Sequence, residues 1–424
     1  MENTPAWVRP LIDRINWSKH FGTQPPTTLC DSHAPDWDRE QFLEQVDFDN
    51  LVAVASSFRN GMSCEIAEEH LGMYNCVYYL AFEDGTQWIA RIPLMFRQFQ
   101  CDDEETEELV QHQLFKSMIA SQTFARRKKG VFAPTIYASF LDGNNPVGVP
   151  FILMQTIVGL RTDEVIGHMH DEVLRPVFSD IAREMVSLAS PPYFTKIGSL
   201  FQNGEDYQVG PLLSQPSLQD DPVDLEKRGP FSTVEDYFVT ALNRHIATAL
   251  RDQNRALYIQ STRLRALVSQ FIDPRFNEGP FILSPFDWDA RDIFFEDRAV
   301  NGILDWDFAQ VVPLQSYFRY PPFMTRDWIA GTKSAVMEHY RRMFRECLAE
   351  LQDETELPLI ELLDQSRWFQ MLDEGIQSSE AGKQALPVLE AYVAAASNRK
   401  FEVKPIPVIK AMPVLKDIKS GGKA

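Results

Sequence analysis

Alternation of apolar and polar residues in the first third of the chain predicts a small antiparallel sheet. The segment 70–82 is typical of two strands joined by a tight turn at 72–75. The sequence E-D-G-T at 83–86 is typical of a hairpin turn and leads into the next strand. The segments in which we expect strands are 70–82, 87–93, 131–141 and 149–157.

A helical period replaces this alternation in two parts of the chain. Apolar residues recur every four positions in the segment 102–120, whose first turn is rich in acidic residues. After residue 159 most of the chain is predicted to be helical, and S-T-V-E at 232–235 matches a capping box for a helix that runs to about residue 255. The Gly-, Pro- and Asp-rich segment 198–224 is predicted to be a long loop. The other predicted helices cover 171–189, 326–352, 357–374 and 385–397.

This order of elements predicts an α+β fold, with an antiparallel sheet and one main helix in its N-terminal part and a mostly helical C-terminal part. The predicted organisation is a leader at 1–50 packed on the first lobe, an N-terminal lobe at 51–157, a C-terminal lobe at 158–399 and a mobile tail at 400–424. The leader contains Trp and Pro but no sustained period. The tail has six lysines against two acids, and its prolines exclude regular helix.

Composition narrows the class of partner. The chain has 424 residues and a formal net charge of −19, which would repel a phosphate backbone, so no nucleic-acid partner is expected. The N-terminus lacks the apolar core of a signal peptide, and the longest apolar stretch, 149–160, is too short to span a bilayer, so no membrane association is expected. Five cysteines without C-x-x-C spacing indicate reduced thiols, and these features together predict a cytoplasmic protein.

The candidate chemistry is concentrated in the segment 281–309. Two short apolar runs, 293–295 and 302–304, predict a hairpin. Carboxylates on loops beside apolar strands present the hard oxygen ligands that Mg²⁺ prefers while leaving coordination positions for phosphates. The alternative is an ordinary solvated acidic loop. A calcium-binding loop is excluded, because Asp292 and Arg298 stand where such a loop needs Gly and Glu. The aspartates at the ends of the predicted strands are Asp287, Asp289, Asp292, Asp305 and Asp307.

These residues resemble the catalytic and metal-binding loops of the aminoglycoside phosphotransferase (choline kinase-like) family, especially its fungal branch. The resemblance implies a bilobal protein-kinase-like fold and the use of ATP and Mg²⁺. Asp287 falls on the catalytic aspartate of the family and Asp305 on its magnesium-binding aspartate. Asp292 takes the place of the metal-binding Asn, and Pro285 and Phe286 replace the His and Gly that precede the catalytic residue.

The same resemblance assigns nucleotide-binding roles in the N-terminal lobe. Arg91, in the sequence W-I-A-R-I, would hold the α- and β-phosphates, and Glu108 would anchor its guanidinium group. Neighbouring acids at 104, 105 and 107 are alternatives to Glu108, and an acid-rich helix start explains all of them equally well. For Arg91 the alternative is an arginine on the solvent face of a strand.

Gly72 and Asn75 would form the turn that covers the phosphates, although Asn is also a common turn former. Met154, Gln155 and Ile157 would line the adenine position at the hinge between the lobes, and an ordinary buried strand is the alternative.

The sequence therefore supports two hypotheses. The first is an ATP- and Mg²⁺-dependent phosphotransferase acting on a hydroxyl of a small polar molecule, with an acidic lobe suited to a cationic acceptor. The second is a catalytically inactive kinase-like module that binds nucleotide or a protein, as the replacements at 285, 286 and 292 allow. The acceptor and the oligomeric state are left undetermined by the sequence.

Overall fold

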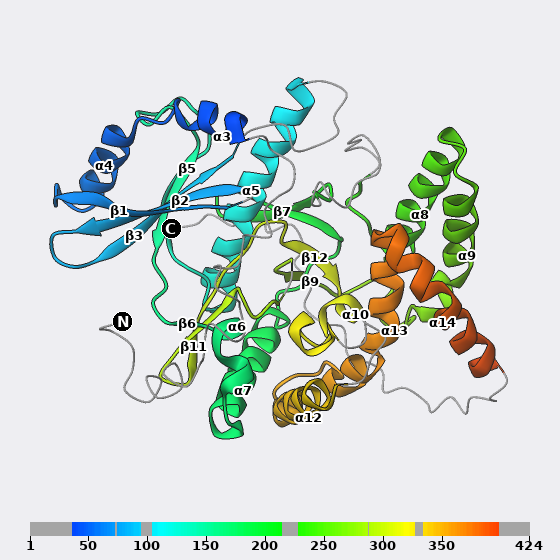
Figure 1. Cartoon of the computed structure of the whole chain (residues 1–424). Coiled ribbons are helices and arrows are strands. Elements are labelled where there is room, and N and C mark those ends of the chain that lie inside the picture. The colour runs from blue at the N-terminus through cyan, green and yellow to red at the C-terminus, as the bar shows by residue number, and fades with distance from the viewer. Residues whose placement is uncertain are drawn as a thin grey trace, which may run out of the picture. The chain divides into compact units, whose positions relative to one another are not determined.

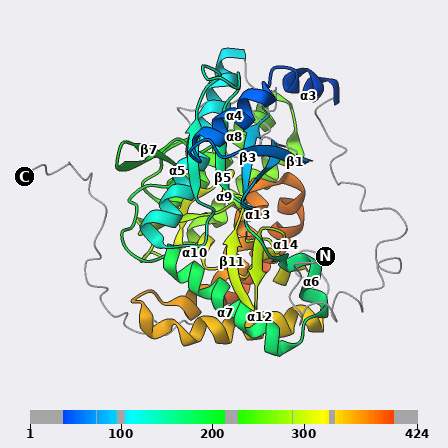
Figure 2. The ribbon, with the colours of Figure 1, turned by 90° about the vertical axis from the view of Figure 1, so that its left-hand side faces the viewer.

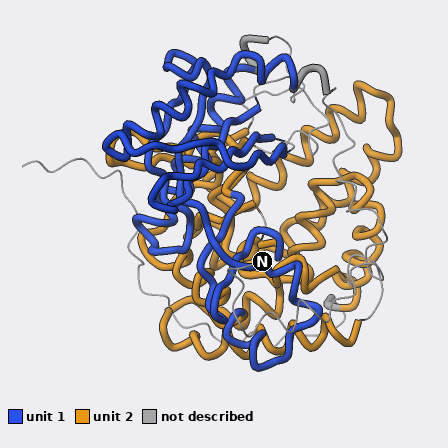
Figure 3. The backbone as a smooth tube through the Cα atoms, turned by 60° about the vertical axis from the view of Figure 1, so that its left-hand side comes forward, with its two compact units in different colours: residues 1–177, 290–305 blue, residues 178–289, 306–424 orange. Residues whose placement is uncertain are grey.

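Two compact units make up the chain. The computed structural model describes residues 36–72, 74–94, 104–213, 228–286, 288–326 and 334–397. Contacts between Cα atoms group residues 1–177 with 290–305 as unit 1, and residues 178–289 with 306–424 as unit 2 (Figure 3). This division differs from a boundary at residue 157, because the segment 290–305 pairs with strand residues at 160–161 and so belongs to unit 1.

Unit 1 is built on a five-stranded antiparallel sheet with the strand order β1-β2-β3-β5-β4 (Figure 1). The third strand coincides with the predicted segment 87–93, whereas the first begins earlier than predicted, at Cys64. The other strands lie inside the predicted segments. The bounds are β1 Cys64–Leu71, β2 Asn75–Phe82, β3 Gln87–Pro93, β4 Ile136–Phe140 and β5 Phe151–Gln155.

One face of this sheet is covered by an apolar core. Alternate residues of β2 and β3 are buried, as the period of two predicts, and they pack with α3 (Asp36–Leu43) and α4 (Phe48–Ser57). Leu51 and Ala55 of α4 are fully buried in that core. Figure 1 shows α4 beside the strands, and Figure 2 shows the same elements turned by 90°. Residues on the opposite face of β2 and β3 therefore remain available for other contacts.

The main helix of unit 1 is α5, which runs over Glu104–Lys129 and is longer than the predicted 102–120. Its last turn carries four basic residues, which favour the negative end of the helix dipole. The C-terminal half of α5 is fixed to the segment before β4: Gln122 Nε2 donates to Pro134 O over 2.8 Å, and Arg126 Nη1 donates to Ala133 O over 2.8 Å.

A second, three-stranded sheet of unit 1 has the order β11-β10-β6. Its strands are β6 Leu160–Arg161, β10 Ile293–Glu296 and β11 Ala299–Ile303, which confirms the predicted hairpin. The short helix α6 (Thr162–Val165) and the 3₁₀ turn η1 (Ile166–His168) follow β6, and α7 (Asp171–Leu188) then leads into unit 2.

Unit 2 holds a four-stranded antiparallel sheet with the order β8-β7-β12-β9. Its bounds are β7 Gly198–Asn203, β8 Asp206–Gly210, β9 Phe281–Ser284 and β12 Gln310–Pro313. The prediction of a loop throughout 198–224 is therefore wrong at its start. The β7–β8 hairpin is not evident from the sequence because its turn residues are equally typical of a loop. In the structure Gly204, at φ +63°, closes a tight turn between the two strands.

The rest of unit 2 is helical. Helix α8 is capped by Thr233, whose side chain accepts from the Asp236 N–H over 3.0 Å, so the N-cap is one residue later than the predicted capping box places it. Helix α9 begins just where the sequence predicts the end of α8. Helices α8, α9 and α13 contact one another, and α14 contacts α9 and α13 (Figure 1). The bounds are α8 Val234–Arg251, α9 Arg255–Phe271, α10 Leu314–Tyr317, η4 Pro322–Met324, α12 Ala335–Glu350, η5 Gln352–Glu354, α13 Leu359–Gln377 and α14 Ser379–Ser397.

The predicted fold class is confirmed. Unit 1 has the antiparallel sheet and single long helix expected of the N-terminal lobe, and unit 2 is mostly helical. Residues 1–35 of the predicted leader and the predicted tail at 400–424 lie outside the described residues. Among the helices that are described, none combines the length and the apolar character needed to cross a bilayer.

Candidate functional site

The β10–β11 hairpin places two of the predicted metal ligands side by side. Ile293 pairs with Ile303, and the Leu304 N–H donates to the Asp292 carbonyl oxygen over 2.7 Å. Asp292 therefore lies opposite Leu304, and Asp305 is the next residue along the chain. Asp292 and Asp305 are 13 residues apart in the sequence, and the predicted hairpin brings their backbones to neighbouring positions at one of its ends.

The backbone around Asp292 is fixed from both sides by the segment that follows β6. The Thr162 hydroxyl, which is fully buried, donates to Ile293 O over 2.8 Å, and the Asp163 N–H donates to Ala290 O over 3.1 Å. Together with the bond from Leu304, these contacts hold residues 290–293 to one conformation. Because this backbone is already fixed, little further conformational entropy is lost when the Asp292 carboxylate binds a ligand.

Asp305 adopts an unusual backbone conformation. Its φ is +55°, in the left-handed region, where a non-glycine residue costs about 1–2 kcal/mol, although Asp and Asn enter it more readily than others. The side chain is exposed. Strain of this kind gathers at functional sites, because only a surrounding structure that fixes the residue can maintain it. The conformation therefore supports a functional role for Asp305.

The electrostatic neighbourhood of Asp292 includes a cation that the sequence analysis missed. Arg161 holds Asp163 through two bonds, Nε to Oδ1 over 3.0 Å and Nη2 to Oδ2 over 2.7 Å. The hydrogen bond to Asp163 raises the pKa of Arg161, and the charge of Asp292 raises it further. Arg161 pairs with Phe294 across β6 and β10, which explains its proximity to Asp292. The negative charge of Asp292 is therefore partly offset before any metal binds.

Arg91 lies on the face of the sheet opposite the apolar core. Its neighbours Ala90 and Ile92 are fully buried on the core side, so the strand period directs Arg91 to the other face. It is opposite Val77 of β2 and Ile152 of β5, at the centre of the sheet. The Nε atom of Arg91 is buried on that face, which weakens the alternative of an arginine on the solvent face of a strand.

Glu108 does not hold Arg91 in this structure. Its side chain is exposed on α5, and no ion pair joins Glu108 to Arg91, both of which are described. Its carbonyl oxygen lies 2.9 Å from His112 Nδ1, one turn later in the helix. Glu108 lies on the exposed face of α5 together with Leu109, whereas Val110 and Gln111 in the same turn face inward and are buried. The side chains of the alternatives at 104, 105 and 107 lie outside the described ones.

Gly72 and Asn75 form the connection between β1 and β2, where the sequence placed the phosphate-covering turn. The Gly72 N–H donates to Asn75 O over 2.8 Å. A Cβ atom at Gly72 would lie 3.0 Å from the same oxygen, so the tight closure favours glycine there. Residue 73, between them, is outside the described part of the chain.

Of the three predicted adenine-position residues, two are engaged within the sheet. Met154 is buried on β5 opposite Ile89. The Gln155 N–H donates to Thr135 O over 2.8 Å, and its side-chain oxygen accepts from the Thr135 N–H over 3.2 Å. Gln155 thus closes the sheet rather than presenting free groups. Backbone groups that could recognise adenine are therefore found from residue 156 onward.

Ile157, the third, lies against the metal-ligand hairpin. A Cβ atom built on Gly302 of β11 would come within 2.4 Å of Ile157 Cγ2, so the two residues are in close contact. The next residue, Val158, accepts a hydrogen bond from the Asn301 side chain. The hinge segment is therefore packed directly on the hairpin that carries Asp292 and Asp305. In the part of unit 1 that is described, the structure brings together Ile157, Asp292 and Asp305.

The predicted catalytic residue, Asp287, lies outside the described residues. The residues before it are described: Ser284 ends β9, and Phe286 makes an edge-to-face contact with Phe308 at 6.2 Å between ring centroids. After it, Asp289 is buried and lies 3.7 Å from the Arg326 guanidinium. Within the described residues, no three or more Cys, His, Asp or Glu side chains are grouped as a metal site. The candidate metal ligands among these residues are therefore two, Asp292 and Asp305.

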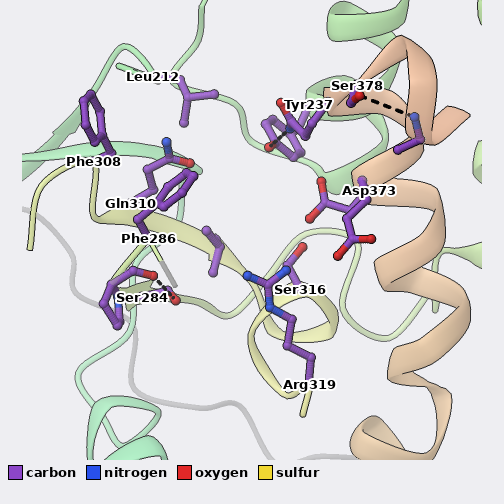
Figure 4. A pocket seen from close by; sticks show the side chains of 15 residues that line it. Leu212, Tyr237, Ser284, Phe286, Phe308, Gln310, Ser316, Arg319, Asp373 and Ser378 are labelled. Atoms are coloured by element: carbon purple, nitrogen blue, oxygen red, sulfur yellow. Dashed lines mark hydrogen bonds between the residues drawn. The ribbon is translucent and has the colours of Figure 1, made fainter. Parts of the chain in front are cut away.

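Unit 2 contains a cavity of about 360 Å³ that the sequence analysis did not predict (Figure 4). Its lining includes Ser284, Pro285 and Phe286, the three residues that directly precede Asp287 in the sequence. The cavity also carries Arg319 and Asp373. The sequence signal for this cavity is the pair of adjacent acids at 373–374 in the amphipathic segment 357–374. Acidic residues on the inner face of a helix are rare unless they have a partner.

Comparison with known proteins gives partial matches. No family model matches the chain. Curated fungal relatives named "Altered inheritance of mitochondria protein 9, mitochondrial" match from Lodderomyces elongisporus (30% identity, 34% of this chain and 24% of the relative), Debaryomyces hansenii (29%, 45% and 30%) and Yarrowia lipolytica (23%, 49% and 41%). The chain thus spans less than half the length of each of these relatives. The predicted cytoplasmic location is contradicted by these relatives, which are named as mitochondrial proteins.

Among solved structures, the chain is similar to an aminoglycoside phosphotransferase, APH(4)-Ia, in a ternary complex with AMP-PNP and hygromycin B. The match has 13% identity and a TM-score of 0.47, and it covers 82% of this chain and 100% of the other. A ternary complex of APH(2″)-IIa with streptomycin and ATP matches at 10% identity with a TM-score of 0.45, over 85% and 97% of the two chains.

Proposed function

We propose that this chain is an ATP- and Mg²⁺-dependent phosphotransferase that acts on a hydroxyl of a small polar molecule. The observation that carries the proposal is the hairpin: Leu304 bonded to Asp292 at 2.7 Å, with Asp305 next to it at φ +55°. Two aspartates whose backbones are held next to each other at a hairpin end would suit a hard cation that keeps most of its coordination for phosphates. Mg²⁺ bound there would neutralise charge on the β- and γ-phosphates.

The protein's own groups would divide the remaining work. Arg91, projecting from the face of the sheet opposite the core, would hold the α- and β-phosphates. Backbone groups of Thr156 and Ile157 make no hydrogen bond with other described residues, so they suit an adenine ring. Asp287 would accept the proton of the acceptor hydroxyl. The role of Glu108 as an anchor for Arg91 would require its side chain to turn away from solvent.

The names of the fungal relatives support a mitochondrial location, which we include in the proposal. Their names say nothing of the acceptor. The cavity in unit 2 supports an acceptor site there, since its wall leads along the chain to Asp287.

A second candidate function is a catalytically inactive nucleotide-binding module. It is favoured by the contact between Phe286 and Phe308, because Phe286 stands where the resembling family has Gly before its catalytic aspartate. A bulky ring at that position occupies space next to the predicted base. Nucleotide binding is common to both candidates, and phosphoryl transfer separates them.

The test is a thermal-shift titration with ATP and Mg²⁺, separately and together, followed by measurement of ATP hydrolysis. The phosphotransferase proposal predicts stabilisation only when both are present, since metal and triphosphate bind as one unit, and it predicts turnover above that of buffer. Stabilisation without turnover, in the presence of extracts of small molecules, would favour the inactive module. No shift with the pair would refute both candidates.

A further inference from the structure

The cavity of unit 2 is apolar on one side and charged on the other. Its volume of about 360 Å³ falls in the range of small-ligand sites. Phe286 and Phe308 form part of the apolar side, together with Leu212. The charged side is formed by α13 and by the segment after α10. Figure 4 shows the side chains of Arg319 and Asp373 directed toward the same space from these two elements.

Asp373 is a carboxylate whose binding capacity is only partly used. Its Oδ1 atom is buried and makes no hydrogen bond with a described residue. Burial raises the pKa of Asp373 to about 6, while the charge of Arg319 and a hydrogen bond with Gln377 act in the opposite direction. A buried carboxylate oxygen without a donor is costly, and a cationic ligand group would remove the cost. The adjacent Glu374 supplies a second carboxylate to the cavity, held by Gln370 Nε2 over 2.7 Å.

Arg319 faces this acidic wall without closing on it. It acts on Asp373 as a nearby charge, yet no ion pair within 4 Å joins the two side chains, both of which are described. Ser316, one turn earlier, has a buried hydroxyl that also makes no hydrogen bond among the described residues. Opposite charges that share a cavity, remain apart and leave neighbouring polar atoms unsatisfied form a site for a ligand that reaches both.

We propose that this cavity binds a small zwitterion: a molecule with an apolar body, an amine that pairs with Asp373 and Glu374, and an acidic group that pairs with Arg319. An amine without an acid would place a second cation beside Arg319. An acid without an amine would face two carboxylates. Only a ligand with both charges satisfies the two sides of the cavity. The ligand is also the hydroxyl-bearing acceptor, and that part of the inference rests on the proposed phosphotransferase function.

Two sets of matched compounds test the charge requirement without nucleotide. The small set is homoserine, 3-amino-1-propanol and 4-hydroxybutyrate, which carry both charges, the amine only and the acid only. The larger set is 3-phenylserine, 2-amino-1-phenylethanol and 3-hydroxy-3-phenylpropanoate, which adds an aromatic body for Phe286 and Phe308. Calorimetric titration of the full chain should show that the zwitterion of at least one set binds at least about tenfold more tightly than both of its analogues.

Two variants test which side chain of the cavity pairs with each charge of the ligand. Arg319→Gln should remove the preference for the zwitterion over its amine-only analogue, and Asp373→Asn should remove the preference over the acid-only analogue. Arg265→Gln, at an exposed position of α9 in the same unit, is the matched control and should change neither. If a variant fails to fold, the comparison within each set on the unaltered protein still decides.

Three results would overturn the inference: an amine-only compound that binds as tightly as its zwitterion, an equal loss for all compounds in Arg319→Gln, or no binding by any compound at millimolar concentration. The proposed function fails separately, if zwitterion binding is found while ATP and Mg²⁺ produce neither stabilisation nor transfer. The two failures are distinguishable because the compound titrations contain no nucleotide.

Discussion

The Leu304 N–H donates to the Asp292 carbonyl oxygen over 2.7 Å, and this bond fixes the end of the β10–β11 hairpin at which both candidate metal ligands stand. It has a direct consequence for function. Asp305 follows Leu304 at φ +55°, so a change in the pairing of this hairpin moves Asp292 and Asp305 together. The candidate metal site is therefore as stable as the hairpin that carries it.

The contact between Gly302 and Ile157 gives a test of this dependence. In Gly302→Ala the new Cβ atom would lie 2.4 Å from Ile157 Cγ2, and relief of the clash should cost about 1–3 kcal/mol in the free energy of unfolding. Urea denaturation measures the cost. Gly167→Ala, where a Cβ atom meets nothing within 4 Å, is the control and should change stability by less than about 0.5 kcal/mol.

A second substitution shows whether the clash is the cause. Ile157→Ala removes Cγ2 and Cγ1, the two atoms nearest to the new Cβ, and leaves only the Ile157 Cβ at 3.2 Å. The double variant should therefore lose less stability than the sum of the two single variants by at least about 1 kcal/mol. Additive losses would show that Gly302 is required for another reason.

Asp292 should change the metal requirement for nucleotide binding. An aspartate adds a negative charge near a triphosphate that the Asn of the resembling family does not, and Arg161 offsets only part of it. The unaltered protein should need more free Mg²⁺ than Asp292→Asn for half-maximal ATP binding, with the two curves converging at high metal concentration. Titration of ATP affinity against Mg²⁺ in both proteins decides it, and superimposable curves would remove Asp292 from the site.

Asp373 should make stability depend on pH. Its pKa is raised from 3.8 to about 6 by burial, so the folded state holds this proton more tightly than the unfolded state does. The resulting stabilisation is fully present below pH 4 and is lost as the pH rises through 6, an amount of about 3 kcal/mol at most. Relative to the unaltered protein, Asp373→Asn should therefore gain stability between pH 4 and 7, as read from denaturation curves at each pH. A difference that is constant over this range would contradict the assignment.

Asp287→Asn should separate binding from turnover. If Asp287 accepts the proton of the acceptor, the variant should keep the affinity for ATP–Mg²⁺ and lose at least about a hundredfold in turnover, because general-base catalysis contributes about that much or more. Calorimetry and an ATP consumption assay on the same preparation measure both quantities. Loss of nucleotide affinity in parallel with turnover would make Asp287 a metal ligand, and unchanged turnover would exclude it as the base.

Much of this account could be predicted from the sequence, and the exceptions have physical causes. Strand β3 and the β10–β11 hairpin were predicted because a period of two and a turn signal are local properties. The β7–β8 hairpin was missed because Gly and Asp residues in its turn resemble loop composition. Helix α9 is not evident from the sequence because only residues 252–254 separate it from α8. There Gln253 has a φ of +53°, and the Asn254 side chain accepts from the Leu257 N–H to cap α9.

The site shows the same division. Adjacency of Asp292 and Asp305 follows from hairpin pairing, which the spacing of their strands encodes. The Arg161 contact with the hairpin and the arrangement of the cavity around Asp373 depend on pairing between distant segments. A single sequence does not show that pairing, and its one signal for the cavity is the acidic pair at 373–374. Exposure of Glu108 was equally hidden, since a helical period does not reveal which acid of a first turn faces inward.

The most direct test of the central claim is ATP affinity in the presence of Mg²⁺ for Asp305→Asn and for Asp297→Asn. Both aspartates lie at positive φ, +55° and +50°, at opposite ends of strand β11, and Asn is tolerated in that conformation, so neither variant should disturb the fold. The account predicts that calorimetric titration will show at least about a tenfold loss of Mg²⁺-dependent affinity in Asp305→Asn and none in Asp297→Asn. Unchanged affinity in Asp305→Asn, or equal losses in both, would contradict the assignment of a metal–nucleotide site to this hairpin.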